Sequence, residues 1–448
     1  MMNTDTERKE ESTAGAERLR IAAYGFVLRD AGSVASAGSE LCAALLRLGC
    51  SIDFYVAAGF VDPVELKEHS GYTYRPISVF GVPAIWKFIE TCVPKKMQRM
   101  TIWLYSQVSQ YLHNRAIAKA IRKRHAESPY DILLVIGLLP PFRIEGLACA
   151  AWPQGPPNGE ADALRSSRER LIRYSGRLTY ALLMYLYWWK RIEARRFMRN
   201  ADAILCGSKW TAGAWERLGA SRSIVYPVAY PFDVDAFQSS RSTAGEGGDS
   251  EFDVPGEGPL ILWLGRIVPR KRIDLALEGF KRLRQSGRKA RLLVIGRISY
   301  ARGYRKLISE YQNLEGFSYR EAIPHHSVPA LLRKTGAILQ PSENEDIGST
   351  VIEGLASGVP AILGATNGTK DYVGETSVVF PSYDPDAVCS ALCETLDRLS
   401  RDDGSIADEC VAQARRAFDT ESVARRVLEI ARETIERTAI GRNSKNKT

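Results

Sequence analysis

Two glutamates, Glu345 and Glu353, lie eight positions apart in a segment with the pattern of a loop that opens into a helix. Gly348, Ser349 and Thr350 lie between them, where the helix is predicted to begin. The first N–H groups of a helix have no intrahelical acceptor, and together with the helix dipole they attract anions. Acidic residues near such an end commonly do no more than complement the dipole. The alternative is that the two carboxylates bracket a bound diphosphate with a polyol on each side of it, as in a nucleotide sugar.

A second group of chemically active residues follows the apolar run 259–264, which predicts a buried strand ending at Gly265. A helix is predicted after it, with Gly287 at its C-terminal end. The junction between strand and helix carries four cations, Arg266, Arg270, Lys271 and Arg272. Cations at the carboxyl end of a parallel strand suit a phosphate ligand, and a solvated basic loop is the alternative.

These two segments together resemble the motifs of the retaining family-4 glycosyltransferases, the glycosyl transferases group 1. The family pattern around the glutamates is Glu-x-Phe-Gly-x4-Glu, then a small-residue helix and Gly-x-Pro. Its matches here are Glu345, Gly348, Glu353, Ala356, Gly358 and Pro360, with Ile347 in place of the aromatic residue. The family's Gly-Arg-x4-Lys is matched by Gly265, Arg266 and Lys271. The resemblance is strong over 255–440 and weak over 20–235.

The resemblance implies an α/β protein of the GT-B fold, in which two Rossmann-like domains with parallel sheets face each other across a donor cleft. It also implies roles for individual residues. The catalytic set is Arg266 and Lys271, which would neutralise the departing diphosphate, and Glu345, which would hold the sugar hydroxyls. The donor-binding set is Glu353 at the ribose, the amides of Gly348, Ser349 and Thr350 at the phosphates, Gly265, Gly32 in a glycine-rich loop near the start, and the backbone near Ile323 at the base.

The remaining patterns agree with such a fold. Strands are predicted at 20–24, 51–56, 131–137, 201–208, 259–264, 290–296, 336–340 and 360–363, and helical patterns separate them. Alternation of this kind implies parallel sheets whose ligands bind beyond the carboxyl ends of the strands. The first strand–helix–strand unit lacks the Gly-x-Gly-x-x-Gly dinucleotide fingerprint.

Two departures from the family pattern concern the sugar site. The first-domain histidine that many relatives use has no match, because His69, His113 and His125 stand in other contexts. Gln154 and Asn158 in the stretch 152–160 are candidates for that contact, although a turn-rich loop is the favoured interpretation. The family's Gly-Gly-x-x-Glu after the glutamate helix is also absent, since residues 366–371 read Thr-Asn-Gly-Thr-Lys-Asp.

No metal site is expected. Asp233 and Asp235 form an Asp-x-Asp pattern, but they fall in the apparent crossing between domains. His325 and His326 lack a cysteine or carboxylate at ligand spacing and are assigned to the loop before a helix at Val328. With basic residues to neutralise the leaving group, a GDP-sugar or UDP-sugar donor would need no metal and no further cofactor.

Composition sets the predicted domain organisation. Residues 1–18 are polar, which predicts a disordered tail and no secretory signal peptide. The predicted units are a first domain over 19–235, a flexible linker over 236–258, and a nucleotide-sugar domain over 259–448 whose last helix packs back on the first domain. No apolar run reaches the roughly 18 residues of a spanning helix. The eight cysteines include no Cys-x-x-Cys pair, which fits a reducing cytoplasm.

The net charge of +9 is concentrated in the first domain. Residues 163–200 hold ten Arg or Lys against two Glu, and the aromatic stretch 180–189 lies among them. A second basic and aromatic stretch runs over 86–125. Basic residues beside Trp and Tyr suit an anionic membrane surface, and a solvated helix pair packed on the domain is the alternative. Nucleic acid is not an expected partner, because no recognition motif accompanies the charge.

The sequence thus predicts transfer of a hexose of the mannose, glucose or N-acetylglucosamine type from a nucleoside-diphosphate sugar to a saccharide or lipid-linked acceptor. The expected location is the cytoplasm or its membrane face. A catalytically silent partner subunit that binds sugars or membrane is the competing hypothesis. A sugar-nucleotide epimerase lacks the paired glutamates, and a phosphorylase needs a cofactor-bearing lysine context that is not found here.

Overall fold

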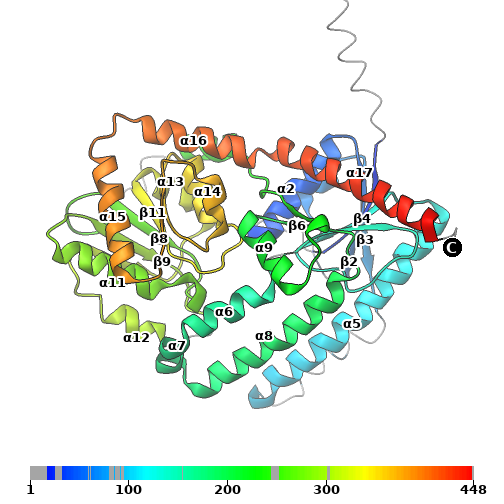
Figure 1. Ribbon diagram of the computed structural model, residues 1–448, viewed down its shortest axis with the longest axis horizontal. Helices are drawn as coiled ribbons and strands as arrows, with labels where there is room; N and C mark the ends of the chain where they lie inside the picture. Colours follow the sequence, from blue (N-terminus) through cyan, green and yellow to red (C-terminus); the bar gives the residue numbers. More distant parts are fainter. Residues whose placement is uncertain are drawn as a thin grey trace, which may run out of the picture.

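The computed structural model describes residues 18–25, 33–58, 60, 62–79, 85, 91, 95–153, 155–243, 252–299 and 303–445. Two parallel sheets, each covered by helices, lie beside each other (Figure 1). The tail predicted over 1–18 lies outside the described residues except for its last position, and so do Gly32 and Gln154. None of the described helices is long and apolar enough to cross a membrane.

The first sheet has seven strands in the order β3-β2-β1-β4-β5-β6-β7, all parallel. Their bounds are Arg20–Gly25 (β1), Ser51–Ala57 (β2), Tyr72–Ile77 (β3), Ile132–Ile136 (β4), Ala148–Trp152 (β5), Ala203–Cys206 (β6) and Val225–Pro227 (β7). All five residues of β4 are buried, and they alternate between two apolar clusters on opposite faces of the sheet. A strand covered on both faces reads as a continuous apolar run, which is why the sequence pattern identified it.

Helices cover both faces of this sheet. Those of the first domain are α2 (Ser33–Arg47), α3 (Val64–Lys67), α5 (Lys95–Glu127), α6 (Pro157–Ser166), α7 (Arg168–Ser175), α8 (Arg177–Met198) and α9 (Lys209–Leu218). Apolar residues of α5, α8 and α9 form one cluster with the sheet. On the other face α2 packs with α17 (Thr420–Lys445), the last helix of the chain, which returns across the first domain (Figure 1).

The second sheet has six parallel strands in the order β10-β9-β8-β11-β12-β13. Their bounds are Leu260–Leu264 (β8), Arg291–Ile295 (β9), Phe317–Arg320 (β10), Thr335–Gln340 (β11), Ala361–Gly364 (β12) and Val378–Phe380 (β13). Helices α11 (Ile273–Gln285) and α15 (Pro385–Leu399) cover one face, with α12 (Tyr304–Ser309) beside them. Helices α13 (Val328–Arg333), α14 (Ser349–Ala356) and α16 (Ser405–Phe418) cover the other. Two facing Rossmann-like domains, as predicted, are therefore confirmed.

Five strands were not predicted, and their compositions explain why. The edge strand β3 contains a proline and only partly covered side chains, while β7 has three residues and ends in Pro227. Alanine and cysteine dominate β5, although it is fully buried. Strands β10 and β13 are short and lie at the two edges of their sheet. Strand β7 is an edge strand of the first sheet and comes shortly before the apparent crossing between the domains.

The prediction of a flexible linker over 236–258 is wrong for its first part. Residues 234–243 form helix α10 (Val234–Thr243), which packs on α13, α14 and α16. The ring of Phe237 lies 5.3 Å from that of Phe232, and the Gln238 amide donates to the Ala356 carbonyl at 3.1 Å. Phe252 and Val254 are buried at the other end. Apolar anchors on both sides of the Ser- and Gly-rich stretch therefore order its ends.

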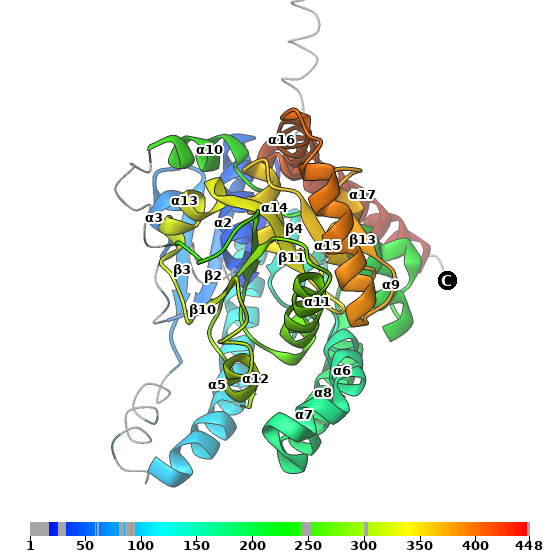
Figure 2. The same cartoon turned by 90° about the vertical axis from the view of Figure 1, so that its left-hand side faces the viewer.

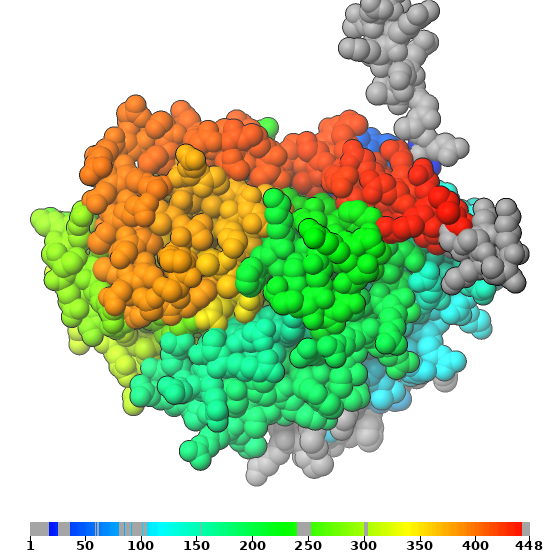
Figure 3. Space-filling view, in the orientation of Figure 1, coloured from blue at the N-terminus to red at the C-terminus, as the bar shows by residue number. Residues whose placement is uncertain are grey.

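Helices α6, α7 and α8 form an arm, residues 157–198, that leaves the first domain and packs on the second (Figure 2). Leu164 and Leu171 are buried within the apolar cluster of the second domain. The rings of Tyr174 and Tyr304 lie 5.6 Å apart, and Arg170 Nη1 lies 2.9 Å from Asp274 Oδ2. Figure 3 shows the arm, in teal, closing the lower side of the molecule under both domains.

Candidate active site

The loop after β8 holds the predicted basic residues. Gly265 follows the strand with φ +154°, a conformation that favours glycine, and its N–H donates to the Ile295 carbonyl at 3.0 Å. A short 3₁₀ turn, Pro269–Lys271, comes next. Arg272 closes the loop at φ +49° and is held by ion pairs with Asp274 and Glu343. The loop therefore presents Arg270 and Lys271 at the carboxyl end of the sheet.

The loop after β11 brings Glu345 to these cations. The Glu343 N–H donates to the Arg270 carbonyl at 2.7 Å, which joins the two loops. Glu345 Oε2 lies 2.6 Å from Arg270 Nη1 and 2.5 Å from Lys271 Nζ. Arg270 Nε lies 2.6 Å from Oε1 of Glu160, which belongs to the arm. A chain of alternating charges thus runs from the first domain to Lys271.

Burial makes these charges interdependent. Glu345 is only 6% exposed. Burial raises the pKa of Glu345, but Arg270 and Lys271 outweigh it and lower the pKa to about 2. Burial lowers the pKa of Lys271, and the nearby Arg270 and Arg266 lower it further, against the opposing effect of Glu345. Glu345 is therefore ionised at neutral pH, and Lys271 lies in a site that more negative charge would stabilise.

Helix α14 begins where the sequence predicted, but Gly348 does not offer its amide. The Gly348 N–H donates to Thr369 Oγ1 at 2.8 Å, and a Cβ at this position would lie 2.1 Å from Gln340 Oε1. The expectation that this amide meets a phosphate is thus at odds with the structure. Ser349 and Thr350 occupy the first two helical positions, where backbone N–H groups have no intrahelical acceptor.

Glu353 lies one turn further along α14 and is buried. Its Oε1 is 3.1 Å from Nε2 of His325, in the turn that precedes α13. The sequence assigns His325 to this loop but does not predict its contact with Glu353. Ile323 is half-buried two residues earlier, so the loop expected at the base borders Glu353 through His325.

A cleft of about 770 Å³ lies between the domains beside this charged cluster. Arg266, Arg270 and Glu345 line it from the second domain. The first domain contributes the segments 137–139, 153 and 155–160, with Pro141, Tyr187, Trp210 and Tyr230. Arg266 is exposed and makes no ion pair with a described residue. The structure thus brings Arg266, Lys271 and Glu345 together at one edge of the cleft.

Two carboxylates of the site were missed from the sequence. Glu160 lies in the stretch 152–160, for which a turn-rich loop was the favoured interpretation. In the structure, helix α6 begins at Pro157 and contains Glu160. A Pro pair before a helical pattern is a signal for such a start. Asp346 is buried, with Tyr230 Oη donating to Oδ2 at 2.9 Å and the Gly207 N–H at 3.3 Å, and burial raises its pKa. Asp346 therefore fastens the glutamate loop to the first domain.

The three histidines of the first domain do not line the cleft. His125 Nδ1 accepts from the Tyr130 N–H at 2.9 Å, and His113 contacts Ser109 of its own helix. Asn158 lines the cleft. Asp235 pairs with Arg415, and the described residues contain no cluster of ligands that could hold a metal ion.

The second domain matches a known family. Residues 249–416 match the model of the family described as glycosyl transferases group 1. The chain is similar to the GDP-mannose-dependent alpha-(1-6)-phosphatidylinositol dimannoside mannosyltransferase of Mycobacterium tuberculosis, with 25% identity over 52% of this chain and 59% of that protein. It is also 26% identical to the 2-deoxystreptamine glucosyltransferase of Streptomyces kanamyceticus, over 36% of this chain and 41% of the relative. The chain thus matches about half the length of these relatives.

Solved structures resemble the whole chain in fold. Anabaena HepE in complex with UDP and glucose covers 92% of this chain with a TM-score of 0.57 and 11% identity, and 99% of that protein is covered. The sucrose-phosphate synthase of Thermosynechococcus elongatus covers 93% with a TM-score of 0.62 and 16% identity, and 99% of it is covered. The second domain is thus similar to glycosyl transferases group 1, and the two facing domains have the GT-B fold.

Proposed function

We propose that this protein transfers a hexose from a nucleoside-diphosphate sugar to a saccharide or lipid-linked acceptor with retention of the anomeric configuration. One observation carries the proposal. Lys271, Arg270 and Glu345 form a buried charged cluster at the carboxyl ends of two parallel strands, beside a helix N-terminus and a cleft between domains. Open α/β sheets bind phosphorylated ligands at such a place.

The charge of the cluster suits a diphosphate leaving group. Three cations, Arg266, Arg270 and Lys271, stand against two carboxylates, Glu160 and Glu345, which leaves an excess of +1. Negative charge develops on the diphosphate as its bond to the sugar breaks, and fixed cations in a site with little water stabilise that charge. Arg266 and Lys271 perform this role, the amides of Ser349 and Thr350 meet the phosphates, and no metal is required.

The carboxylates orient the two ends of the donor. Glu345 is ionised and fixed by two cations, so it accepts hydrogen bonds from sugar hydroxyls without titrating at neutral pH. Glu353 accepts hydrogen bonds from the ribose hydroxyls, which replace its contact with His325. A GDP-sugar or UDP-sugar fits this arrangement, and mannose is supported by the names of the mycobacterial relatives.

We place the protein in the cytoplasm, in contact with the anionic face of a membrane. One side of α8 packs on the second domain, and the other exposes the stripe Leu178, Leu182, Tyr185, Trp189 and Ile192. Arg177, Lys190 and Arg195 flank this stripe on the same helix. Aromatic and basic side chains on one surface bind anionic lipid. In Figures 1 and 2 the stripe's helix lies at the same edge of the molecule as the first half of α5.

Co-sedimentation with vesicles of phosphatidylglycerol and phosphatidylcholine tests the membrane contact. Leu182→Ser with Trp189→Ser removes apolar contact and is expected to weaken binding by about tenfold or more, at ~0.8 kcal/mol per buried CH₂. Ile440→Ser alters another exposed apolar residue, on α17, and is the control. Equal binding by all three proteins contradicts the assignment.

A catalytically silent subunit is the second candidate, because no described first-domain histidine reaches the cleft. Lys271→Ala separates the two. Loss of one fixed donor to developing negative charge lowers kcat roughly 10²–10³-fold. Transfer is measured with GDP-mannose, UDP-glucose and UDP-N-acetylglucosamine, with and without Mg²⁺, and the product anomer is read by NMR. Lys289→Ala, which removes an exposed lysine paired with Glu257, is the control.

Two results would refute the proposal. One is near-normal turnover by Lys271→Ala, which would remove the cluster from catalysis. The other is donor binding by the unsubstituted protein without transfer or hydrolysis of any donor, which favours the silent subunit.

A further inference from the structure

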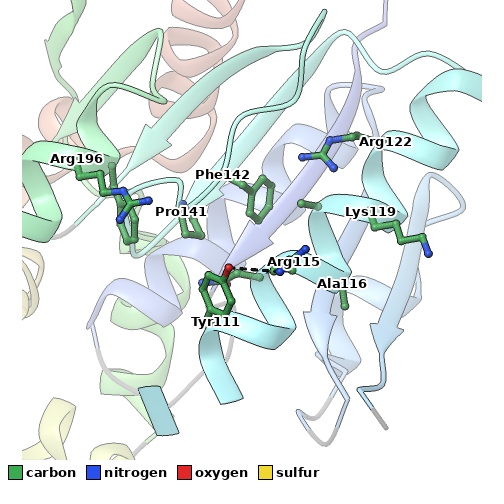
Figure 4. Close-up of a pocket in the computed structure, with 11 residues that line it drawn as sticks. Tyr111, Arg115, Ala116, Lys119, Arg122, Pro141, Phe142 and Arg196 are labelled. Carbon is green, nitrogen blue, oxygen red and sulfur yellow. Dashed lines mark hydrogen bonds between the residues drawn. The ribbon is translucent and has the colours of Figure 1, made fainter. Parts of the chain in front are cut away.

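A second cavity, of about 530 Å³, lies in the first domain between α5, α8 and the loop after β4. Arg115, Lys119 and Arg122 line it from α5, and Arg196 lines it from α8. Among the described residues the lining contains no carboxylate. In the view of Figure 4, Phe142 lies between Arg196 and the cations of α5.

The four cations have no carboxylate partner among the described residues, whereas Lys123 and Arg124, the next cations along α5, both contact Glu127. Arg115 Nη1 lies 3.5 Å from Tyr111 Oη, and its guanidinium lies 5.8 Å from the ring centre. Four like charges around one cavity repel each other, and an anion in the cavity relieves that repulsion.

The cavity continues into the cleft of the active site. Tyr111, Asn114, Pro141 and Phe197 line both. A molecule that places an anionic group among the four cations therefore extends past these residues toward Arg270 and Glu345, which line the other part of the cleft. The rings of Phe142 and Phe197 supply apolar surface beside the charges.

We propose that this cavity binds a phosphate or diphosphate group of the acceptor, and that the protein acts on phosphorylated acceptors. Guanidinium groups match phosphate geometry, and four cations exceed what a neutral saccharide needs. The inference rests on the proposed function, because the phosphorylated molecule is taken to be the acceptor that enters the cleft opposite the donor. The phosphate is carried by a prenyl tail or by a saccharide, and the shared chemistry is the phosphate ester.

Calorimetric titration of the full chain tests this inference with three probes: geranyl diphosphate, glucose 1-phosphate and inorganic pyrophosphate. Arg115→Gln with Lys119→Gln removes two cations of the cavity and keeps the helix. The variant loses charge-assisted hydrogen bonds from two cations to the phosphate group, so it is expected to raise the Kd at least about tenfold. Lys123→Gln with Arg124→Gln removes the same charge from the same helix outside the cavity and is expected to change the Kd less than about twofold.

The probes distinguish the sources of the phosphate. Tight binding of geranyl diphosphate alone supports a lipid-linked phosphate, and tight binding of glucose 1-phosphate supports a phosphorylated saccharide. Equal binding of all three supports a site for the phosphate group itself. Failure of all three to bind, or equal weakening by both double variants, overturns the inference. Titration with GDP and UDP reports on the donor site separately, so failure of the proposed function shows itself independently.

Discussion

The charge of Glu345 is expected to hold the two loops of the active site together, and Glu345→Gln removes that charge with little change in shape. The fall in the pKa of Glu345 from 4.5 to about 2 corresponds to about 3 kcal/mol, at 1.36 kcal/mol per pH unit. Arg270 and Lys271 are left without this partner, in surroundings where their side chains are only 15% and 14% exposed. We therefore expect the variant to lose about 3 kcal/mol of unfolding free energy, within the usual range for breaking a buried pair.

Thermal unfolding measures this loss. For a domain of this size about 3 kcal/mol lowers the Tm by roughly 6–12 °C. The double variant Glu345→Gln with Lys271→Met removes both charges and is expected to recover most of the stability. Glu257→Gln, in an exposed pair with Lys289, serves as the control and should leave the Tm unchanged.

The dependence of the Tm on pH tests the contribution of the Glu345 charge independently. Because the folded pKa of Glu345 lies below the unfolded value of 4.5, its stabilisation is fully present above pH 4.5 and is lost as pH falls toward about 2. The difference in Tm between wild type and Glu345→Gln should therefore be constant from neutral pH to about 5 and shrink below 4.5. A single variant as stable as wild type, or a double variant as unstable as the single one, would refute the reasoning.

Three further predictions concern neighbouring residues. Gly348→Ala should lower the free energy of unfolding, measured in urea, by roughly 1–3 kcal/mol, because its Cβ would lie 2.1 Å from Gln340 Oε1. A Cβ at Gly287 would meet no such neighbour, so Gly287→Ala reports only the strain of a positive φ. His325→Ala should change the KM for the donor within about tenfold and leave kcat near normal, because it removes one partner of Glu353, and an unchanged KM with a collapsed kcat would contradict this. Glu160→Gln should lower stability by at most about 1 kcal/mol, because the pair with Arg270 is partly exposed, and a larger loss in unfolding experiments would show that the pair is a main link between the domains.

The sequence predicted the strands that are buried on both faces, except the alanine-rich β5, and the motifs at their ends. Apolar runs such as that of β4 carry their own signal, because helices cover them on either side. Edge strands such as β3 were missed because partial exposure and a proline weaken the pattern. In the second domain the basic loop and the glutamate helix lie about eighty residues apart in sequence. Their placement at the carboxyl ends of parallel strands, together with the family resemblance, predicted that they meet.

Contacts across the domain boundary could not be predicted in the same way. The pairing of Glu160 with Arg270 depends on the position of the arm, which no local pattern specifies. The same holds for Asp346 and Tyr230, which are 116 positions apart and belong to different domains. Gly348 was misassigned because its hydrogen bond to Thr369 comes from a loop that follows the next strand.

The arm of α6, α7 and α8 has a consequence for dividing the chain. Sequence places the domain boundary near residue 235, but the arm lies before that point and is packed on the second domain. A first half produced alone would expose Leu164 and Leu171 to water, and a second half alone would lose their cover over α11 and α12. Each piece would therefore aggregate, and the halves should regain solubility only when they are produced together. Any swap of acceptor domains between relatives of this protein must transfer the arm with the domain on which it packs.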